Sequence, residues 1–100
     1  MEVTIKESEG MMTARLSGRL DTPAAVEVSR EVKPLLDHPD RTILLDCSEL
    51  TYISSSGLRI FLTIRKAAAS AGGKVVIEGL SPEIRQVFMM TGFLQLFEIK

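Results

Sequence analysis

Residues 42–70, TILLDCSELTYISSSGLRIFLTIRKAAAS, decide the fold of this 100-residue chain. The apolar run at residues 42–45, which ends at Asp46 and Cys47, is typical of a strand that is covered on both sides. Residues 58–69 carry aliphatic side chains at helical spacing, with polar side chains on the opposite face. Three serines and a glycine come just before this helical pattern. The stretch therefore predicts a strand, a serine turn and an amphipathic helix.

The serine turn, residues 54–57, stands where the predicted helix begins. A hydroxyl residue just before a helix caps it, because its oxygen accepts from a free N–H group of the first turn. The same helix end stabilises anions, and a phosphoserine adds about −1.5 to −2 charge at pH 7. One serine is enough for a cap. The pattern leaves two interpretations open. The serines are ordinary capping residues, or another protein recognises or modifies one of them.

The N-terminal part of the chain has the pattern of a β-hairpin. Residues 3–7 and 11–18 alternate in polarity around a short turn that contains Gly10. Residues 19–21 are expected to continue the second strand along the edge of the sheet.

A helix is predicted to follow, with Thr22 as its N-cap and Pro23 as its first residue. Its apolar residues recur on one side, which predicts that it covers the sheet. Pro34 removes a backbone hydrogen bond, so the last turn is expected to kink or to start a separate short helix. The helical region is expected to end at residues 38–40.

The C-terminal part repeats the alternation of strands and helices. Gly72 and Gly73 are expected to end the long helix, and Ser81 is expected to cap the next one. A strand, a helix and a short final strand are predicted at residues 74–78, 83–90 and 96–99. The predicted fold class is α/β: a single domain over residues 1–100, with a mixed β-sheet, an N-terminal hairpin and parallel strands joined by helices.

Composition and charge exclude several classes of function. Lysine and arginine number 12 against 13 aspartates and glutamates, and the charges are interspersed, so there is no basic face for nucleic acid. No apolar run approaches the roughly 20 residues of a membrane span, and the N-terminus lacks an export signal. We therefore expect a cytoplasmic protein, monomeric or weakly dimeric, with no membrane or nucleic-acid partner and no cofactor. Cys47, the only cysteine, is expected in the core.

Enzymatic and metal sites are also disfavoured. A serine nucleophile at a strand-to-helix turn usually lies in Gly-x-Ser-x-Gly, but Ile53 and Ser54 occupy the positions of the first glycine. The only histidine, His38, is expected at a helix end, so no general base is evident. One cysteine and one histidine cannot form a structural zinc site. The sequence predicts no catalytic and no metal-binding residues.

Taken together, the motifs of this chain resemble the STAS domain, and within it the small bacterial anti-sigma factor antagonists. The resemblance covers essentially the whole chain and is carried by Ser17-Gly18-Arg19-Leu20-Asp21, Ile43-Leu44-Leu45-Asp46, Ile53-Ser54-Ser55-Ser56-Gly57-Leu58, Ala71-Gly72-Gly73-Lys74, Ser81-Pro82 and Met90-Thr91-Gly92-Phe93. The serine motif is the specific one. In the family it is typically Asp-Ser-Ser-Gly, so Ser54 stands where the family usually has aspartate.

The resemblance implies a phosphorylation-switched binding module. In the family, the first serine of Ser-Ser-Gly is phosphorylated by a partner that is both an anti-sigma factor and a serine kinase. That serine corresponds to Ser55, with Ser54 and Ser56 as competing acceptors and Ser56 as the expected structural cap. The unphosphorylated antagonist binds the partner and so frees a sigma factor. A phosphatase restores binding.

The expected partner-binding surface surrounds the serine turn and consists of Asp21, Thr22, Ser54, Ser56, Gly57, Leu58, Arg59 and Leu62. The negative charge of Asp21 could equally well stabilise the N-terminus of the helix that follows it, instead of contacting a partner. The alternative function is that of a STAS adaptor or scaffold subunit, in a signalling assembly or beside a transport system.

Overall fold

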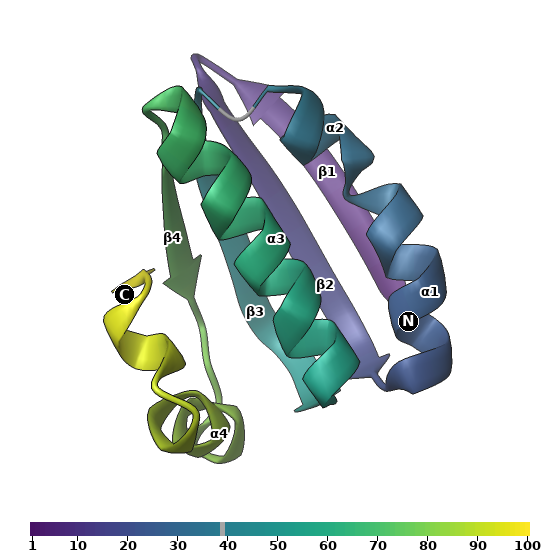
Figure 1. Cartoon of the computed structure of the whole chain (residues 1–100). Coiled ribbons are helices and arrows are strands. Elements are labelled where there is room, and N and C mark those ends of the chain that lie inside the picture. Colours follow the sequence, from purple (N-terminus) through teal and green to yellow (C-terminus); the bar gives the residue numbers. More distant parts are fainter. Residues whose placement is uncertain (39) are drawn as a thin grey trace.

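The computed structural model describes residues 1–38 and 40–100, which form a five-stranded sheet with its strands in chain order (Figure 1). β1 (Glu2–Ser8) and β2 (Met11–Leu20) form an antiparallel hairpin. β3 (Thr42–Ile53), β4 (Lys74–Glu78) and β5 (Glu98–Ile99) follow, each parallel to the strand before it. The predicted mixed sheet with an N-terminal hairpin is confirmed.

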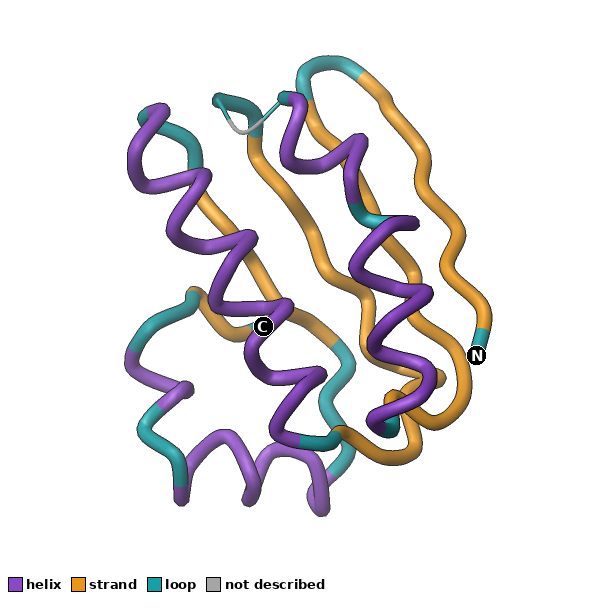
Figure 2. Tube along the Cα trace, turned by 45° about the vertical axis from the view of Figure 1, so that its right-hand side comes forward, coloured by secondary structure: helices purple, strands orange, loops and turns teal. Residues whose placement is uncertain are grey.

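Helices connect the parallel strands. α1 (Thr22–Glu31) and α2 (Lys33–Asp37) join β2 to β3, α3 (Ser55–Ala71) joins β3 to β4, and α4 (Pro82–Met90) and a 3₁₀ turn, η1 (Phe93–Gln95), lead to β5. α1 and α3 run side by side across one face of the sheet (Figure 2). Among the described residues, no helix combines the length and apolar composition needed to cross a membrane.

The core lies between these helices and the sheet. Alternate side chains of β2 and β3 are buried on the helix-covered face, namely Met12, Ala14, Leu16, Ile43, Leu45 and Cys47. Phe61 of α3 and Phe88 of α4 pack edge to face, with ring centroids 5.8 Å apart. The expectation that Cys47 belongs to the core is confirmed.

Two strands differ from their predicted lengths. β3 continues beyond Cys47 to Ile53 because it stays paired with β2 as far as Leu20. The final strand is limited to Glu98–Ile99, since the chain before it forms η1 instead of extending.

The first helical region agrees with the prediction in one respect and differs in another. A break at Val32 separates α1 from α2, and Pro34 lies in the first turn of the separate short helix, as the sequence allowed. The N-cap of α1 is Asp21, so the prediction that Thr22 caps this helix is wrong. The predicted helix end at residues 38–40 includes Pro39, which lies outside the described residues.

Candidate functional site: the serine turn

The serine turn, Ser54 to Gly57, is positioned by the ends of two parallel strands. Leu20 and Ile53, the last residues of β2 and β3, lie opposite one another in the sheet. The backbone N–H of Ser54 then donates to the carbonyl of Leu20 at 2.8 Å. The chain turns into α1 after Leu20 and into α3 after Ser54. The two helices therefore begin at the same end of the sheet, where β2 and β3 finish.

Side-chain oxygens cap both helices at this end of the sheet. Ser54 Oγ accepts from the backbone N–H of Gly57 at 3.2 Å, and Asp21 Oδ1 accepts from that of Ala24 at 3.0 Å. Both capping residues have extended backbones, with φ and ψ of −89° and 172° for Ser54 and −86° and −178° for Asp21. The prediction that Ser56 is the structural cap is therefore wrong, because Ser56 already lies inside the helix. For Asp21, the structure supports the helix-start interpretation.

Ser55 is the first residue of α3, and its side chain is exposed. Within residues 1–38 and 40–100, its hydroxyl makes no hydrogen bond to another protein group. Ser54 and Ser56 are half-buried. Of the three serines, Ser55 therefore offers the most accessible hydroxyl, at the positive end of a 17-residue helix.

Gly57 and Leu58 face the core. A Cβ atom on Gly57 would lie 2.7 Å from Leu20 Cγ and 2.9 Å from Ile53 Cγ1, so only glycine lets α3 pack this closely on the strand ends. Leu58 is 7% exposed and belongs to the core cluster. This corrects the expectation that the Leu58 side chain is presented to a partner.

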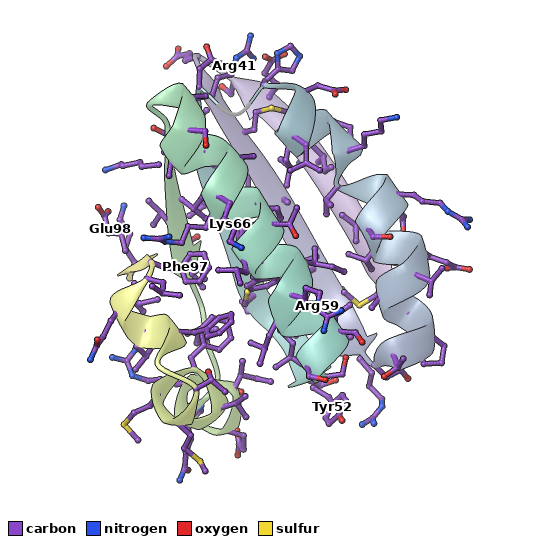
Figure 3. All side chains as sticks on the ribbon, in the orientation of Figure 1. Arg41, Tyr52, Arg59, Lys66, Phe97 and Glu98 are labelled. Atoms are coloured by element: carbon purple, nitrogen blue, oxygen red, sulfur yellow. The ribbon has the colours of Figure 1, made fainter. Side chains whose placement is uncertain are left out.

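A groove between α1 and α3 brings several of the predicted site residues together. Its volume is about 310 Å³, and it is lined by Thr22, Ala25, Val26, Ser29, Ser56, Arg59, Ile60 and Thr63. Arg59 is exposed, one turn after Ser55, and lies near the start of α3 (Figure 3). Leu62 is half-buried and does not line this groove. Thr22, Ser56 and Arg59 thus share one surface beside the Ser55 hydroxyl.

Sequence reasoning missed a pair of residues near this end of the sheet, Arg19 and Tyr52. The Arg19 guanidinium carbon lies 4.4 Å from the centroid of the Tyr52 ring, a cation–π geometry. These residues are opposite one another in β2 and β3, directly after a register shift that leaves Thr51 as the extra residue. The signal in the sequence was the run Leu50-Thr51-Tyr52-Ile53, in which two residues instead of one separate the aliphatic side chains. In the structure, Thr51 and Tyr52 are both exposed.

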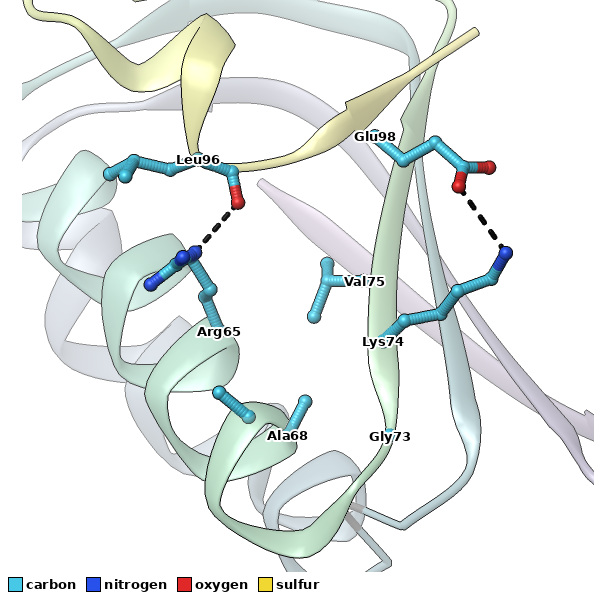
Figure 4. Close-up of a pocket in the computed structure, with 8 residues that line it drawn as sticks. Arg65, Ala68, Gly73, Lys74, Val75, Leu96 and Glu98 are labelled. Atoms are coloured by element: carbon cyan, nitrogen blue, oxygen red, sulfur yellow. Dashed lines mark hydrogen bonds and ion pairs between the residues drawn. The ribbon is translucent and has the colours of Figure 1, made fainter.

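A second cavity, of about 220 Å³, lies between α3 and the β4–β5 edge, away from the serine turn (Figure 4). Arg65 Nε donates to the carbonyl of Leu96 at 2.6 Å, and Lys74 Nζ is 3.3 Å from Glu98 Oε1. Both interactions hold the C-terminal segment against the rest of the domain. The polar groups that line this cavity are therefore accounted for by contacts within the fold.

Two ionisable groups of β3 have shifted pKa values. Burial raises the pKa of the Cys47 thiol to about 12, and the charge of Asp46 adds to the rise. For Asp46, burial favours a higher pKa, but hydrogen bonds from the Ser48 hydroxyl and N–H, together with Arg15, lower it overall. Neither group belongs to the serine turn, and the thiol is protonated at neutral pH.

Comparison with known proteins identifies the family. The model of the STAS domain matches residues 2–100, so the chain belongs to the STAS-domain family. BtrV of Bordetella bronchiseptica, named as a candidate anti-sigma factor antagonist, is 34% identical over 99 residues, which cover 99% of this chain and 85% of BtrV. The anti-sigma-B factor antagonist of Bacillus subtilis is 26% identical over 100 residues, covering 99% of this chain and 90% of that protein.

The fold is also that of a solved antagonist. The Bacillus protein SpoIIAA has been solved unphosphorylated and phosphorylated, and this chain matches the two structures with TM-scores of 0.76 and 0.75, at 19% and 20% identity. The matches cover 99% of this chain and 87% and 91% of the two SpoIIAA chains. The resemblance to STAS-domain antagonists seen in the sequence is confirmed. Both sequence relatives are named as antagonists of anti-sigma factors.

Proposed function

We propose that this chain is an anti-sigma factor antagonist that binds an anti-sigma factor with serine kinase activity and loses that binding when Ser55 is phosphorylated. The observation that carries the proposal is the exposed Ser55 hydroxyl at the first position of α3, within a chain of the STAS-domain family. Binding sequesters the partner and frees a sigma factor. A phosphatase that removes the phosphate restores binding.

The roles of the three serines support Ser55 as the acceptor. The Ser54 oxygen already accepts from Gly57 N–H in the cap, so a kinase would have to break this hydrogen bond to reach the Ser54 hydroxyl. Ser56 is half-buried in the groove beside α1, where a phosphoryl group has less room. Ser55 can accept a phosphate without losing a protein contact.

The presence of Ser54 in place of the aspartate of the family motif has a simple physical explanation. Serine and aspartate are both strong N-cap residues, because each provides an oxygen that accepts from the first turn. In this chain Asp21 caps α1 in the same way that Ser54 caps α3. The replacement therefore preserves the cap and leaves the neighbouring Ser55 as the modified residue.

Electrostatics explain how phosphorylation would act on binding and not on folding. The α3 N-terminus stabilises an anion by roughly 0.3 to 1 kcal/mol, and Arg59 adds a cation one turn away. A partner surface that fits a neutral hydroxyl would instead have to bury up to about two negative charges. Leaving a buried charge unpaired at an interface costs about 2 to 5 kcal/mol, so the cost falls on the complex.

The fold of this chain matches SpoIIAA in both its unphosphorylated and its phosphorylated form. A phosphate held at a helix start is stabilised there, so the proposed switch leaves the fold intact. Because sigma factors act on RNA polymerase, the proposal also places the protein in the cytoplasm.

Phosphate transfer tests the proposed function. The protein is incubated with ATP and a histidine-kinase-like ATPase, sought among the genes that neighbour this one, and modified serines are mapped by mass spectrometry. We expect one phosphate on Ser55 and none on the Ser55→Ala variant, while Ser70→Ala, an exposed serine of the same helix, behaves as wild type. Transfer to Ser55→Ala at the wild-type rate contradicts the assignment. A stable complex without phosphate on any serine supports the adaptor function instead.

A further inference from the structure

The two edges of the sheet differ in how they are protected against pairing with another strand. β5, at one edge, has two residues, too few to offer a useful template. β1, at the other edge, has seven residues, EVTIKES, and contains no proline. Its pairing with β2 continues without a register shift from Glu2, opposite Ser17, to Ser8, opposite Met11. In Figure 2 this strand runs along the margin of the molecule from the N label, with no other described segment beyond it.

The side chains of β1 are self-complementary in one antiparallel register. With Thr4 placed opposite Thr4 of a second copy, Glu2 of each strand faces Lys6 of the other, which gives two ion pairs. The same register places Val3 opposite Ile5 twice. Charged pairs then lie on one face of the joined strands and apolar pairs on the other, because side chains alternate along a strand.

Burial in the monomer agrees with this division of faces. Glu2, Thr4 and Lys6 are exposed, whereas Val3 and Ile5 are half-buried and pack against the core. A second β1 strand would extend the apolar layer beneath the helices and remove the remaining exposed surface of Val3 and Ile5 from water. Backbone N–H and C=O groups along the free edge would also gain partners.

We propose that the outer edge of β1 is a self-association surface, on which a second copy of this chain pairs antiparallel about Thr4. The two sheets join into one continuous ten-stranded sheet, twice the five strands of one copy. The interface is a single strand wide, so the dimer is weak and depends on protein concentration. It is also sensitive to salt, because two exposed ion pairs fix the register.

Charge reversal at the two paired positions gives a direct test by sedimentation equilibrium, from micromolar to millimolar protein. Wild type is expected to self-associate. Glu2→Lys creates two Lys–Lys pairs in its own dimer, and Lys6→Glu creates two Glu–Glu pairs, so each variant alone should associate about tenfold or more weakly. An equimolar mixture of the two variants restores both opposite-charge pairs and should associate as tightly as wild type.

The control variant is Lys66→Glu, which reverses an exposed lysine on α3 and should leave association unchanged. Thermal melts of all variants show whether the domain stays folded, as expected for substitutions at exposed positions. A wild-type protein that stays monomeric throughout, a single variant that associates as wild type, or a mixture that does not associate overturns the proposal.

The register itself is tested by oxidation of a Thr4→Cys variant. Directly opposite residues of antiparallel strands have Cα atoms about 4.5 to 5.5 Å apart, which is within the range for a disulfide. The Thr4→Cys protein should form a covalent dimer, whereas Ser8→Cys, far from its counterpart in this register, should not. Cys47 is buried and does not compete. Equal crosslinking of both variants contradicts pairing about Thr4.

Discussion

The backbone N–H of Ser54 donates to the carbonyl of Leu20 at 2.8 Å, and this one bond joins the start of α3 to the turn that starts α1. Because Leu20 is fully buried at the end of β2, the serine turn is anchored to the core and not to a flexible loop. The exposed Ser55 hydroxyl therefore lies directly after a residue that is bonded to the buried end of β2. This arrangement is compatible with a site that a partner binds without a change in the fold.

The close packing of Gly57 against Leu20 predicts the cost of a single methyl group. In Gly57→Ala the added Cβ would lie 2.7 Å from Leu20 Cγ, and Leu20 is too enclosed to move freely. We expect a loss of about 1 to 3 kcal/mol in the free energy of unfolding, measured by urea titration. Ser70→Ala in the same helix is exposed and serves as the control. A neutral or stabilising effect of Gly57→Ala would contradict the packing described.

The assignment of Ser54 as the N-cap predicts different effects for neighbouring serines. Ser54→Ala removes the acceptor for Gly57 N–H and should cost about 1 kcal/mol of stability, whereas Ser54→Asp should retain most of the cap. Ser56→Ala should change stability little, because Ser56 makes no capping bond among the described contacts. Urea unfolding of the three variants compares them. A larger loss for Ser56→Ala than for Ser54→Ala would show that the cap is assigned to the wrong residue.

The buried Cys47 thiol predicts a pH dependence of stability. Its pKa is raised from 9.0 to about 12, so the unfolded chain loses this proton at lower pH than the folded one. The contribution of the buried thiol to the free energy of unfolding is complete below pH 9. It is lost as the pH rises from about 9 to 12, at up to about 1.4 kcal/mol per pH unit. The stability difference between wild type and Cys47→Ala should therefore shrink across this range.

A thiol reagent at pH 8 provides an independent check on Cys47. The native protein should resist labelling, and the urea-unfolded protein should react at once, since the thiol is 1% exposed in the fold. Native labelling at the rate of the unfolded chain would be inconsistent with this burial.

The bond from Arg65 to the Leu96 carbonyl predicts a local effect at the C-terminus. Arg65→Met keeps the apolar stem but removes the donor that holds Leu96 at 2.6 Å, at a cost of about 1 to 2 kcal/mol. Hydrogen exchange should accelerate at Lys100 N–H, which donates to Ile77, more than at core amides of β2 and β3. Lys66→Met is the matched control on the solvent face of α3. Unchanged exchange at Lys100 would show that Arg65 does not hold this segment.

Local signals predicted much of this fold. Ser81 before Pro82 predicted the cap of α4, and its Oγ does accept from Ile84 N–H at 3.2 Å. Gly72 ends α3 in the left-handed conformation, with φ 81°. In these cases a short run of residues contains the whole interaction, so the sequence is sufficient.

Features that depend on strand pairing were not predictable in the same way. Three consecutive serines can each cap a helix, and the choice of Ser54 follows from the pairing of Ile53 with Leu20, which keeps the chain extended to that point. The exposure of Tyr52 results from the register shift in β3, which depends on β2. Leu58 lies at the edge of the apolar arc of α3, and only its packing on the strand ends shows that it is buried.

In the proposed mechanism, a charge on Ser55 blocks binding without unfolding the domain. The experiment titrates the wild type, its phosphorylated form, Ser55→Ala and Ser55→Asp against the cognate kinase, with thermal melts in parallel. We predict that phosphorylation lowers affinity by about 30-fold to several thousand-fold, that Ser55→Asp shows part of this loss, and that Ser55→Ala binds as the unmodified protein does. Melting temperatures should stay within about 5 °C of one another, because capping and helix-dipole effects at the start of α3 are below about 1 kcal/mol. Equal affinities for all four proteins, or a large drop in the melting temperature of Ser55→Asp, would contradict the claim.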